Sequence, residues 1–143
     1  MTCYLGLDPG LAQAKGTAWA LYDPESDTLD VGRLRPRKDA ANDFHAQFDI
    51  CRQLEDLVRY ELQRPVSGVV IEGQVANYGQ DLGPNASTAR LSELEGALGV
   101  TLVRAGMPPE RVLKLHPSTI KAAVLKGNAK KEAVRSMVLS MAF

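Results

Sequence analysis

The chain has little of what marks secreted, zinc-binding or membrane proteins. Its 143 residues contain two cysteines, Cys3 and Cys51, and neither belongs to a CxxC pair or a histidine-rich cluster. Two isolated thiols make neither a disulfide framework nor a zinc site, and they suit a reducing compartment. The sequence has no basic start followed by a long apolar stretch, and no apolar run approaches the length of a membrane span. We therefore expect a soluble, cytoplasmic protein without zinc.

The chain also has no excess of either charge, but its charges are unevenly distributed. Hydrophobic residues make up 45% and charged residues 24%, which is globular composition, and the length suits one domain. Residues 1–103 hold nine Lys and Arg against fifteen Asp and Glu, whereas residues 104–143 hold eight against two. Such a basic segment is typical of a nucleic-acid contact surface, although an ordinary solvated helix surface is the alternative.

The apolar patterns predict a mixed α/β sheet with helices on its faces. The helix expected over 39–64 has an apolar stripe that we expect in the core, and Trp19 is also expected there. The stripe comprises Phe44, Phe48, Cys51, Leu54, Leu57, Val58 and Leu62. Strands are predicted at 3–8, 16–22, 28–34, 67–72 and 111–115. Further helices are predicted from about 85 to 99, with 100–103 either extending or ending the helix, and over 117–125 and from 129 onward.

Two of the predicted strands end in a carboxylate, Asp8 and Glu72. In layered α/β sheets, ligands gather beyond the carboxyl ends of the strands. If these strands are parallel neighbours, the two acids meet and repel each other unless a cation lies between them. Mg²⁺ suits such a site because it is a hard ion that prefers oxygen ligands. The alternative is that Asp8, which precedes Pro9 and Gly10, is an ordinary turn residue.

The same residues carry a resemblance to a known family. The run Gly6-Leu7-Asp8-Pro9-Gly10, followed by the strand from Gly16, resembles the opening of the RuvC family of Holliday-junction resolvases. The run Val69-Val70-Ile71-Glu72 resembles that family's central strand with its metal-binding glutamate. Residues 85–99, 117–121 and 127–138 resemble later segments of the family, in the same order, so the similarity extends over nearly the whole chain.

The resemblance implies a fold, an activity and partners. The fold would be ribonuclease H-like, a five-stranded mixed sheet flanked by helices, with the first and fourth strands adjacent and parallel. The protein would be a homodimeric endodeoxyribonuclease of DNA recombination and repair. It would hydrolyse four-way DNA junctions or related branched DNA with Mg²⁺ or Mn²⁺. Asp8 and Glu72 match the first two acidic ligands, with Asp8 bridging two metal ions.

Basic residues near the C-terminus are the expected DNA contacts. Lys121 and Lys131 match lysines that the family places near the DNA backbone. Phosphate contacts of this kind make affinity salt-dependent and carry no sequence information. The full set that we expect to contact phosphate is Lys114, Lys121, Lys126, Lys130, Lys131 and Arg135.

The chain departs from the family in two places. The family's remaining acidic ligands lie on a final helix after the segment matching Met137, but no acid follows Glu132 here. We expect either a protein that continues past Phe143 into that helix or one with an incomplete metal site, since two ligands alone hold Mg²⁺ loosely. In the loop after Glu72, Tyr78 is the nearest candidate for the family's junction wedge. It would stack on exposed bases, or alternatively pack on its own domain.

Other interpretations remain beside the nuclease. The alternative function is a non-catalytic branched-DNA-binding domain with an incomplete metal site. A pure protein-interaction domain would make no use of the basic segment. Actin-like and sugar-kinase phosphotransferases also open with Gly-x-Asp-x-Gly, but this chain is too short for their second domain. His116, at the end of the fifth strand, either approaches the metal site or only precedes Pro117 in a turn.

Overall fold

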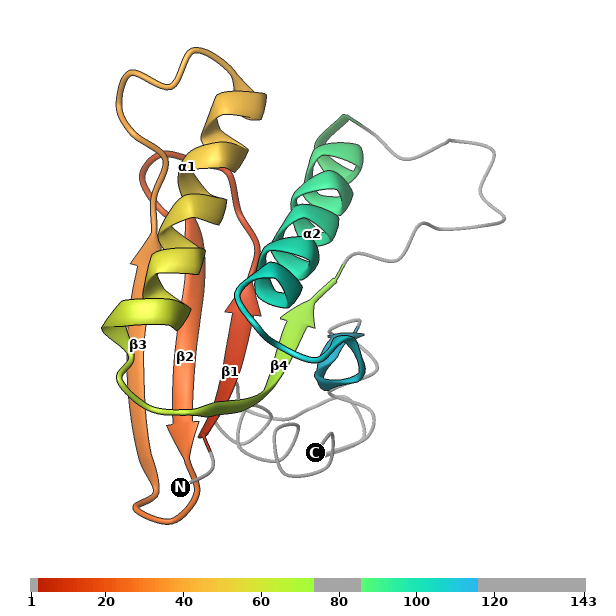
Figure 1. Ribbon diagram of the computed structural model, residues 1–143. Helices are drawn as coiled ribbons and strands as arrows, with labels where there is room; N and C mark the ends of the chain where they lie inside the picture. Colours follow the sequence, from red (N-terminus) through yellow and green to blue (C-terminus); the bar gives the residue numbers. More distant parts are fainter. Residues whose placement is uncertain (1–2, 74–85, 116–143) are drawn as a thin grey trace, which may run out of the picture.

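A five-stranded sheet with helices packed on one face forms the fold (Figure 1). The computed structural model describes residues 3–73 and 86–115. The strands are β1 (Cys3–Asp8), β2 (Thr17–Asp23), β3 (Thr28–Leu34), β4 (Val66–Glu72) and β5 (Val112–Leu115). The helices are α1 (Asp43–Asp56), continued by the π-helical η1 (Leu57–Glu61), α2 (Ala86–Arg104) and the short 3-10 helix η2 (Pro109–Arg111).

The strand order is β3-β2-β1-β4-β5, and the sheet is mixed. β1, β2 and β3 form an antiparallel meander, β4 is parallel to β1, and β5 is parallel to β4. The parallel pairs need crossover connections, which α1 and α2 supply. The expected mixed α/β sheet is therefore confirmed, including the adjacent and parallel first and fourth strands.

The helix ends differ from the sequence prediction for local reasons. α1 begins at Asp43 instead of 39 because the side chain of Asn42 accepts a hydrogen bond from His45 N at 2.9 Å and caps the helix. α2 continues through 100–103 to Arg104. Gly106 follows it with φ +109°, a left-handed conformation that suits glycine after a helix end. No helix in the described ranges is long and apolar enough to span a membrane.

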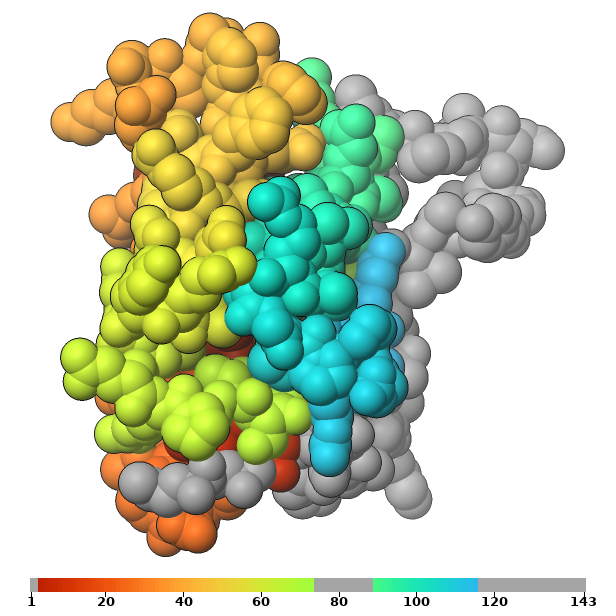
Figure 2. All heavy atoms as spheres, viewed as in Figure 1, coloured from red at the N-terminus to blue at the C-terminus, as the bar shows by residue number. Residues whose placement is uncertain are grey.

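The hydrophobic core lies between the helices and the sheet. Buried side chains of β1 and β4 form one layer of it, and buried leucines of α1 and α2 form the other. Figure 1 shows both helices lying over one face of the sheet, and Figure 2 shows them from that side. The two helices also contact each other, since Arg90 pairs with Asp43 at 2.9 Å and Gln47 donates to Glu93 at 3.2 Å. Among the described residues, the fully buried leucines, isoleucine and valine are Leu5, Leu21, Ile50, Leu54, Val69, Leu94, Leu98 and Leu102.

The apolar stripe expected on α1 is only partly correct. Phe44 and Phe48 are exposed, at 63% and 59% of their surfaces, so their assignment to the core is wrong. Leu54 and Leu57 of the expected stripe are buried, as is Ile50, which was not part of it, and this buried face lies roughly opposite the two phenylalanines. The phenylalanine rings contact each other edge to face with centroids 4.6 Å apart. Trp19 is half-buried and packs against the core, as expected in part.

Candidate metal centre

The strand register brings Asp8 and Glu72 side by side. In the parallel pair of β1 and β4, Leu5 pairs with Val69, Gly6 with Val70 and Leu7 with Ile71. One residue further, both strands end, β1 at Asp8 and β4 at Glu72. Cα atoms of paired residues on adjacent strands lie about 5 Å apart. The two carboxylates therefore occupy neighbouring positions at one edge of the sheet, as the sequence prediction required.

Both acids lie on the face of the sheet that α1 and α2 do not cover. Side chains alternate between faces along a strand. Leu7 and Ile71 belong to the core under the helices, so the next residue on each strand is directed to the opposite face. Asp8 is exposed and Glu72 is half-buried. Among the described residues, neither α1 nor α2 covers the two acids.

The turn after β1 is closed by groups other than Asp8. Thr17 is fully buried, and its Oγ1 accepts from Gly10 N at 3.2 Å and donates to Gly10 O at 3.0 Å. Gly16 has φ +58° and donates from its N–H to Ala12 O at 2.6 Å. A Cβ on Gly16 would also collide with the Leu34 carbonyl. These contacts of Thr17 and Gly16 hold the turn in place. Asp8 takes no part in them, so the turn does not require a structural role for Asp8.

The two carboxylates can supply oxygen ligands for a hard divalent cation. Mg²⁺ is commonly held by one or two carboxylates together with water and substrate phosphates, so the donor set fits. Within residues 3–73 and 86–115, no group of three or more His, Cys, Asp and Glu gathers as a metal site. The described part of the chain thus provides a pair of ligands.

Most of the expected DNA-contacting residues lie outside the described ranges. The same is true of His116, the candidate near the metal, and of Tyr78, the candidate wedge. Of the basic residues, Lys114 is described, on β5. Those that lie outside the described residues are Lys121, Lys126, Lys130, Lys131 and Arg135.

Comparison with solved structures identifies the fold. The structure of T. thermophilus RuvC in complex with a Holliday junction substrate matches with a TM-score of 0.60 and 14% sequence identity. The match covers 99% of this chain and 92% of that one. The chain has a RuvC-like fold. No protein-family model matches the sequence, and no curated protein matches it.

The structure confirms the part of the sequence resemblance that concerns the fold. The five-stranded mixed sheet and the adjacency of β1 and β4 are confirmed. At 14% identity the likeness is one of fold, so the roles of individual residues rest on the geometry of this chain.

One ionic contact near the site was not expected from the sequence. Lys114 Nζ lies 2.7 Å from Glu95 Oε2, and the Glu95 side chain is only 1% exposed. Lys114 was expected to contact DNA phosphate, but here its ammonium is paired within the chain. The available signal was the position of Glu95, four residues after Leu91 and three before Leu98 on the buried side of α2. A charge in such a stripe is buried and needs a partner.

Proposed function

We propose that this protein is a metal-dependent endonuclease that resolves Holliday junctions or related branched DNA. The observation that carries the proposal is the pair of carboxylates at the ends of β1 and β4, adjacent in register and on the face of the sheet that α1 and α2 do not cover. The RuvC-like fold supports it, because the matching RuvC structure is a complex with a Holliday junction substrate.

In this proposal Asp8 and Glu72 would hold Mg²⁺ or Mn²⁺. Such an ion, when bound, supplies an activated water and neutralises charge on the leaving oxygen of the phosphodiester. The chain's own contribution is to hold two oxygen ligands on rigid neighbouring strands, so that neither ligand has to be ordered during the reaction. A DNA backbone would approach the two acids from the face of the sheet that α1 and α2 do not cover.

Basic side chains would neutralise phosphates along the bound DNA. The bias of residues 104–143, with eight Lys and Arg against two Asp and Glu, supports this part of the proposal. Among the described residues, Arg104 and Arg111 are exposed and belong to this basic set. The further phosphate contacts stay predictions, together with Tyr78 as the side chain that stacks on bases. The predicted phosphate contacts outside the described residues are Lys121, Lys126, Lys130, Lys131 and Arg135.

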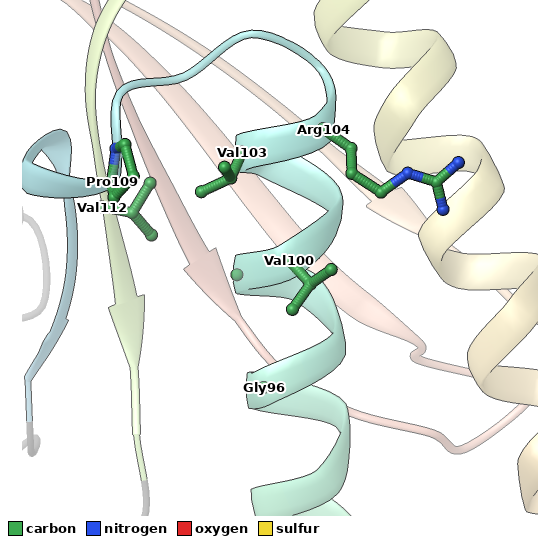
Figure 3. Close-up of a pocket in the computed structure, with 7 residues that line it drawn as sticks. Gly96, Val100, Val103, Arg104, Pro109 and Val112 are labelled. Atoms are coloured by element: carbon green, nitrogen blue, oxygen red, sulfur yellow. The ribbon is translucent and has the colours of Figure 1, made fainter.

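We also propose that two copies associate through the outer face of α2. Val100 and Val103 are 62% and 40% exposed, and they line an apolar hollow of about 410 Å³ with Pro109 and Val112. Figure 3 shows Val103 projecting from α2 toward Val112, with Gly96 lower on the same helix. Exposed apolar surface of this kind supports an interface, and glycines allow close approach of a partner helix.

A non-catalytic junction binder is the second candidate. It is favoured by the fact that the described residues supply two acidic ligands and no third. The two candidates bind the same DNA and differ in the chemistry that follows.

A cleavage assay on a synthetic four-way junction tests the proposal. The wild-type protein should cut the junction in Mg²⁺ or Mn²⁺ and should stop in EDTA. Asp8→Asn and Glu72→Gln should each lower the cleavage rate by about a hundred-fold or more, because loss of an outer-shell group alone costs up to that much metal affinity. Junction binding in a gel-shift assay should persist in both variants, since phosphate contacts dominate affinity.

The matched control is Asp56→Asn, which removes an exposed acid at the C-terminal end of α1. It should cut at the wild-type rate. Binding without cleavage in every divalent metal would select the junction binder instead. Metal-dependent cleavage that Asp8→Asn leaves unchanged would remove the assigned site.

A further inference from the structure

The end of β4 is held from the helix side by a lysine that is itself anchored in the core. Lys114 Nζ pairs with the buried Glu95 carboxylate of α2, as described above. Between its ends, the lysine side chain covers Gly73, the residue that follows Glu72. A Cβ built on Gly73 would lie 2.5 Å from Lys114 Cγ and 2.9 Å from its Cδ. The atom nearest to that Cβ is Lys114 Cε, so a side chain at position 73 would require the lysine stem to shift.

The backbone at this point is tied to the same strand. Gly73 N–H donates to Leu115 O at 2.8 Å, and Glu72 pairs in register with Leu115. Gly73 is buried although it follows the last residue of β4. The cover that buries it on the helix side includes the Lys114 stem. One contact network therefore joins α2, β5 and the residue next to the candidate metal ligand.

We propose that Lys114, anchored by Glu95, is a positioning residue that fixes the end of β4 and with it the side chain of Glu72. The role in metal binding rests on the proposed function. The clamp on Gly73 is a property of the fold and is tested without metal. It gives the lysine a purpose other than the phosphate contact expected from the sequence, since its charge is directed to a carboxylate under the helix layer.

The first experiment measures the clamp alone. Removal of the lysine by itself would take the ammonium away from a buried carboxylate and would destabilise the fold. The informative variant is therefore Lys114→Ala combined with Glu95→Leu, which removes the stem and the buried charge together. Native-state hydrogen exchange by NMR should show the Gly73 amide exchanging about ten-fold faster or more, because local opening no longer displaces a packed side chain.

Lys38→Ala is the matched control, because it removes an exposed lysine from another part of the chain. Its Gly73 amide should exchange at the wild-type rate. If the double variant is folded and its Gly73 amide is as protected as in the wild type, the clamp does not exist and the proposal is overturned.

The second experiment measures the steric contact between residues 73 and 114. It does not use the double variant of the first experiment, so it still tests the clamp if that variant does not fold. Gly73→Ala in the otherwise unchanged protein should lower the melting temperature, because the new methyl displaces Lys114 from Glu95. The same substitution made together with Lys114→Ala should add little to the loss that Lys114→Ala causes alone. Additive losses would contradict the contact between residues 73 and 114.

The third experiment measures positioning of the ligand. Mn²⁺ binding, followed by electron paramagnetic resonance well below the melting temperature, should weaken about ten-fold in the Lys114→Ala and Glu95→Leu double variant, as expected for loss of a supporting group. A faster Gly73 amide with unchanged Mn²⁺ affinity would show a clamp that does not position Glu72. If Asp8→Asn leaves the Mn²⁺ affinity of the wild type unchanged, the proposed metal site fails while the clamp stands on the first two experiments.

Discussion

At the scale of single residues, Cys51 shows how the contact between the helices changes a side chain's chemistry. It lies on α1 and is half-buried, packed against the core. Burial raises the pKa of its thiol, because the thiolate loses hydration, and a hydrogen bond with Thr101 of α2 offsets this only in part. The thiolate is the reactive form, so a raised pKa makes the folded protein less reactive.

We therefore predict slow alkylation of Cys51 in the folded protein at pH 8. The rate of reaction with iodoacetamide, followed by mass spectrometry, should rise with pH through a midpoint above the ordinary cysteine value of about 8.5. The contribution of this thiol to the free energy of unfolding is fully present below the pKa that the thiol has in the unfolded chain. It is lost as the pH rises through the higher pKa of the folded state, because the unfolded chain gives up the proton more readily.

The alkylation experiment has an internal reference in the denatured chain. In denaturant the thiol should titrate at its ordinary value and react faster at pH 8. Cys3 is fully buried and should stay unmodified in the folded state. Alkylation of native Cys51 at the denatured rate would contradict the burial of this side chain between the helices.

At the scale of elements, the strands were predictable because their signals are local. Continuous apolar runs bounded by Gly and Pro gave β1 and β4 to within one residue. The face of α1 was not predictable, because Phe44 and Phe48 continue the apolar spacing of Leu54 and Leu57 as well as Ile50 does. Which of the two stripes is buried depends on how the helix rolls against the sheet, and that is a tertiary property.

The orientation of α1 against the sheet can be tested by comparing a buried residue of the helix with an exposed one. Leu54→Ala should destabilise the protein by about 2 to 5 kcal/mol, because it leaves a cavity in the core. Phe48→Ala should change stability by about 0.5 kcal/mol or less, as for exposed positions. Chemical denaturation monitored by circular dichroism measures both. A loss for Phe48→Ala as large as for Leu54→Ala would return the phenylalanine to the core.

The strand-end positions of the two candidate ligands were predictable, but the contacts around them were not. Asp8 and Glu72 stand out in the sequence because an acid ends each of two apolar strands. Their adjacency needed the strand order, which the sequence suggested only through the family resemblance. The pairing of Lys114 on β5 with Glu95 on α2 was not predictable. The two residues are far apart in the sequence, and no spacing pattern links them to each other or to Gly73.

At the scale of the whole molecule, the outer face of α2 should decide the oligomeric state. We predict that the wild-type protein is a dimer in analytical ultracentrifugation and that Val100→Asp weakens the dimer by more than about ten-fold, because a charge would be buried at the interface. Val31→Asp is the matched control, since Val31 on β3 is equally exposed, at 63%, and lies on an edge strand.

Two results would count against this interface. A wild-type protein that stays monomeric at high micromolar concentration would remove the dimer altogether. A dimer that Val100→Asp and Val31→Asp affect alike would place the contact elsewhere on the molecule.

The order of the strands also has a consequence for when the candidate metal site forms. β1, β2 and β3 form from consecutive residues, so their meander can assemble early on a growing chain. β4 is synthesised later and must insert beside β1, on the edge that the meander leaves open. Asp8 and Glu72 are therefore not brought side by side until β4 has docked on β1, so under the proposed function the metal site forms only once this strand is in place.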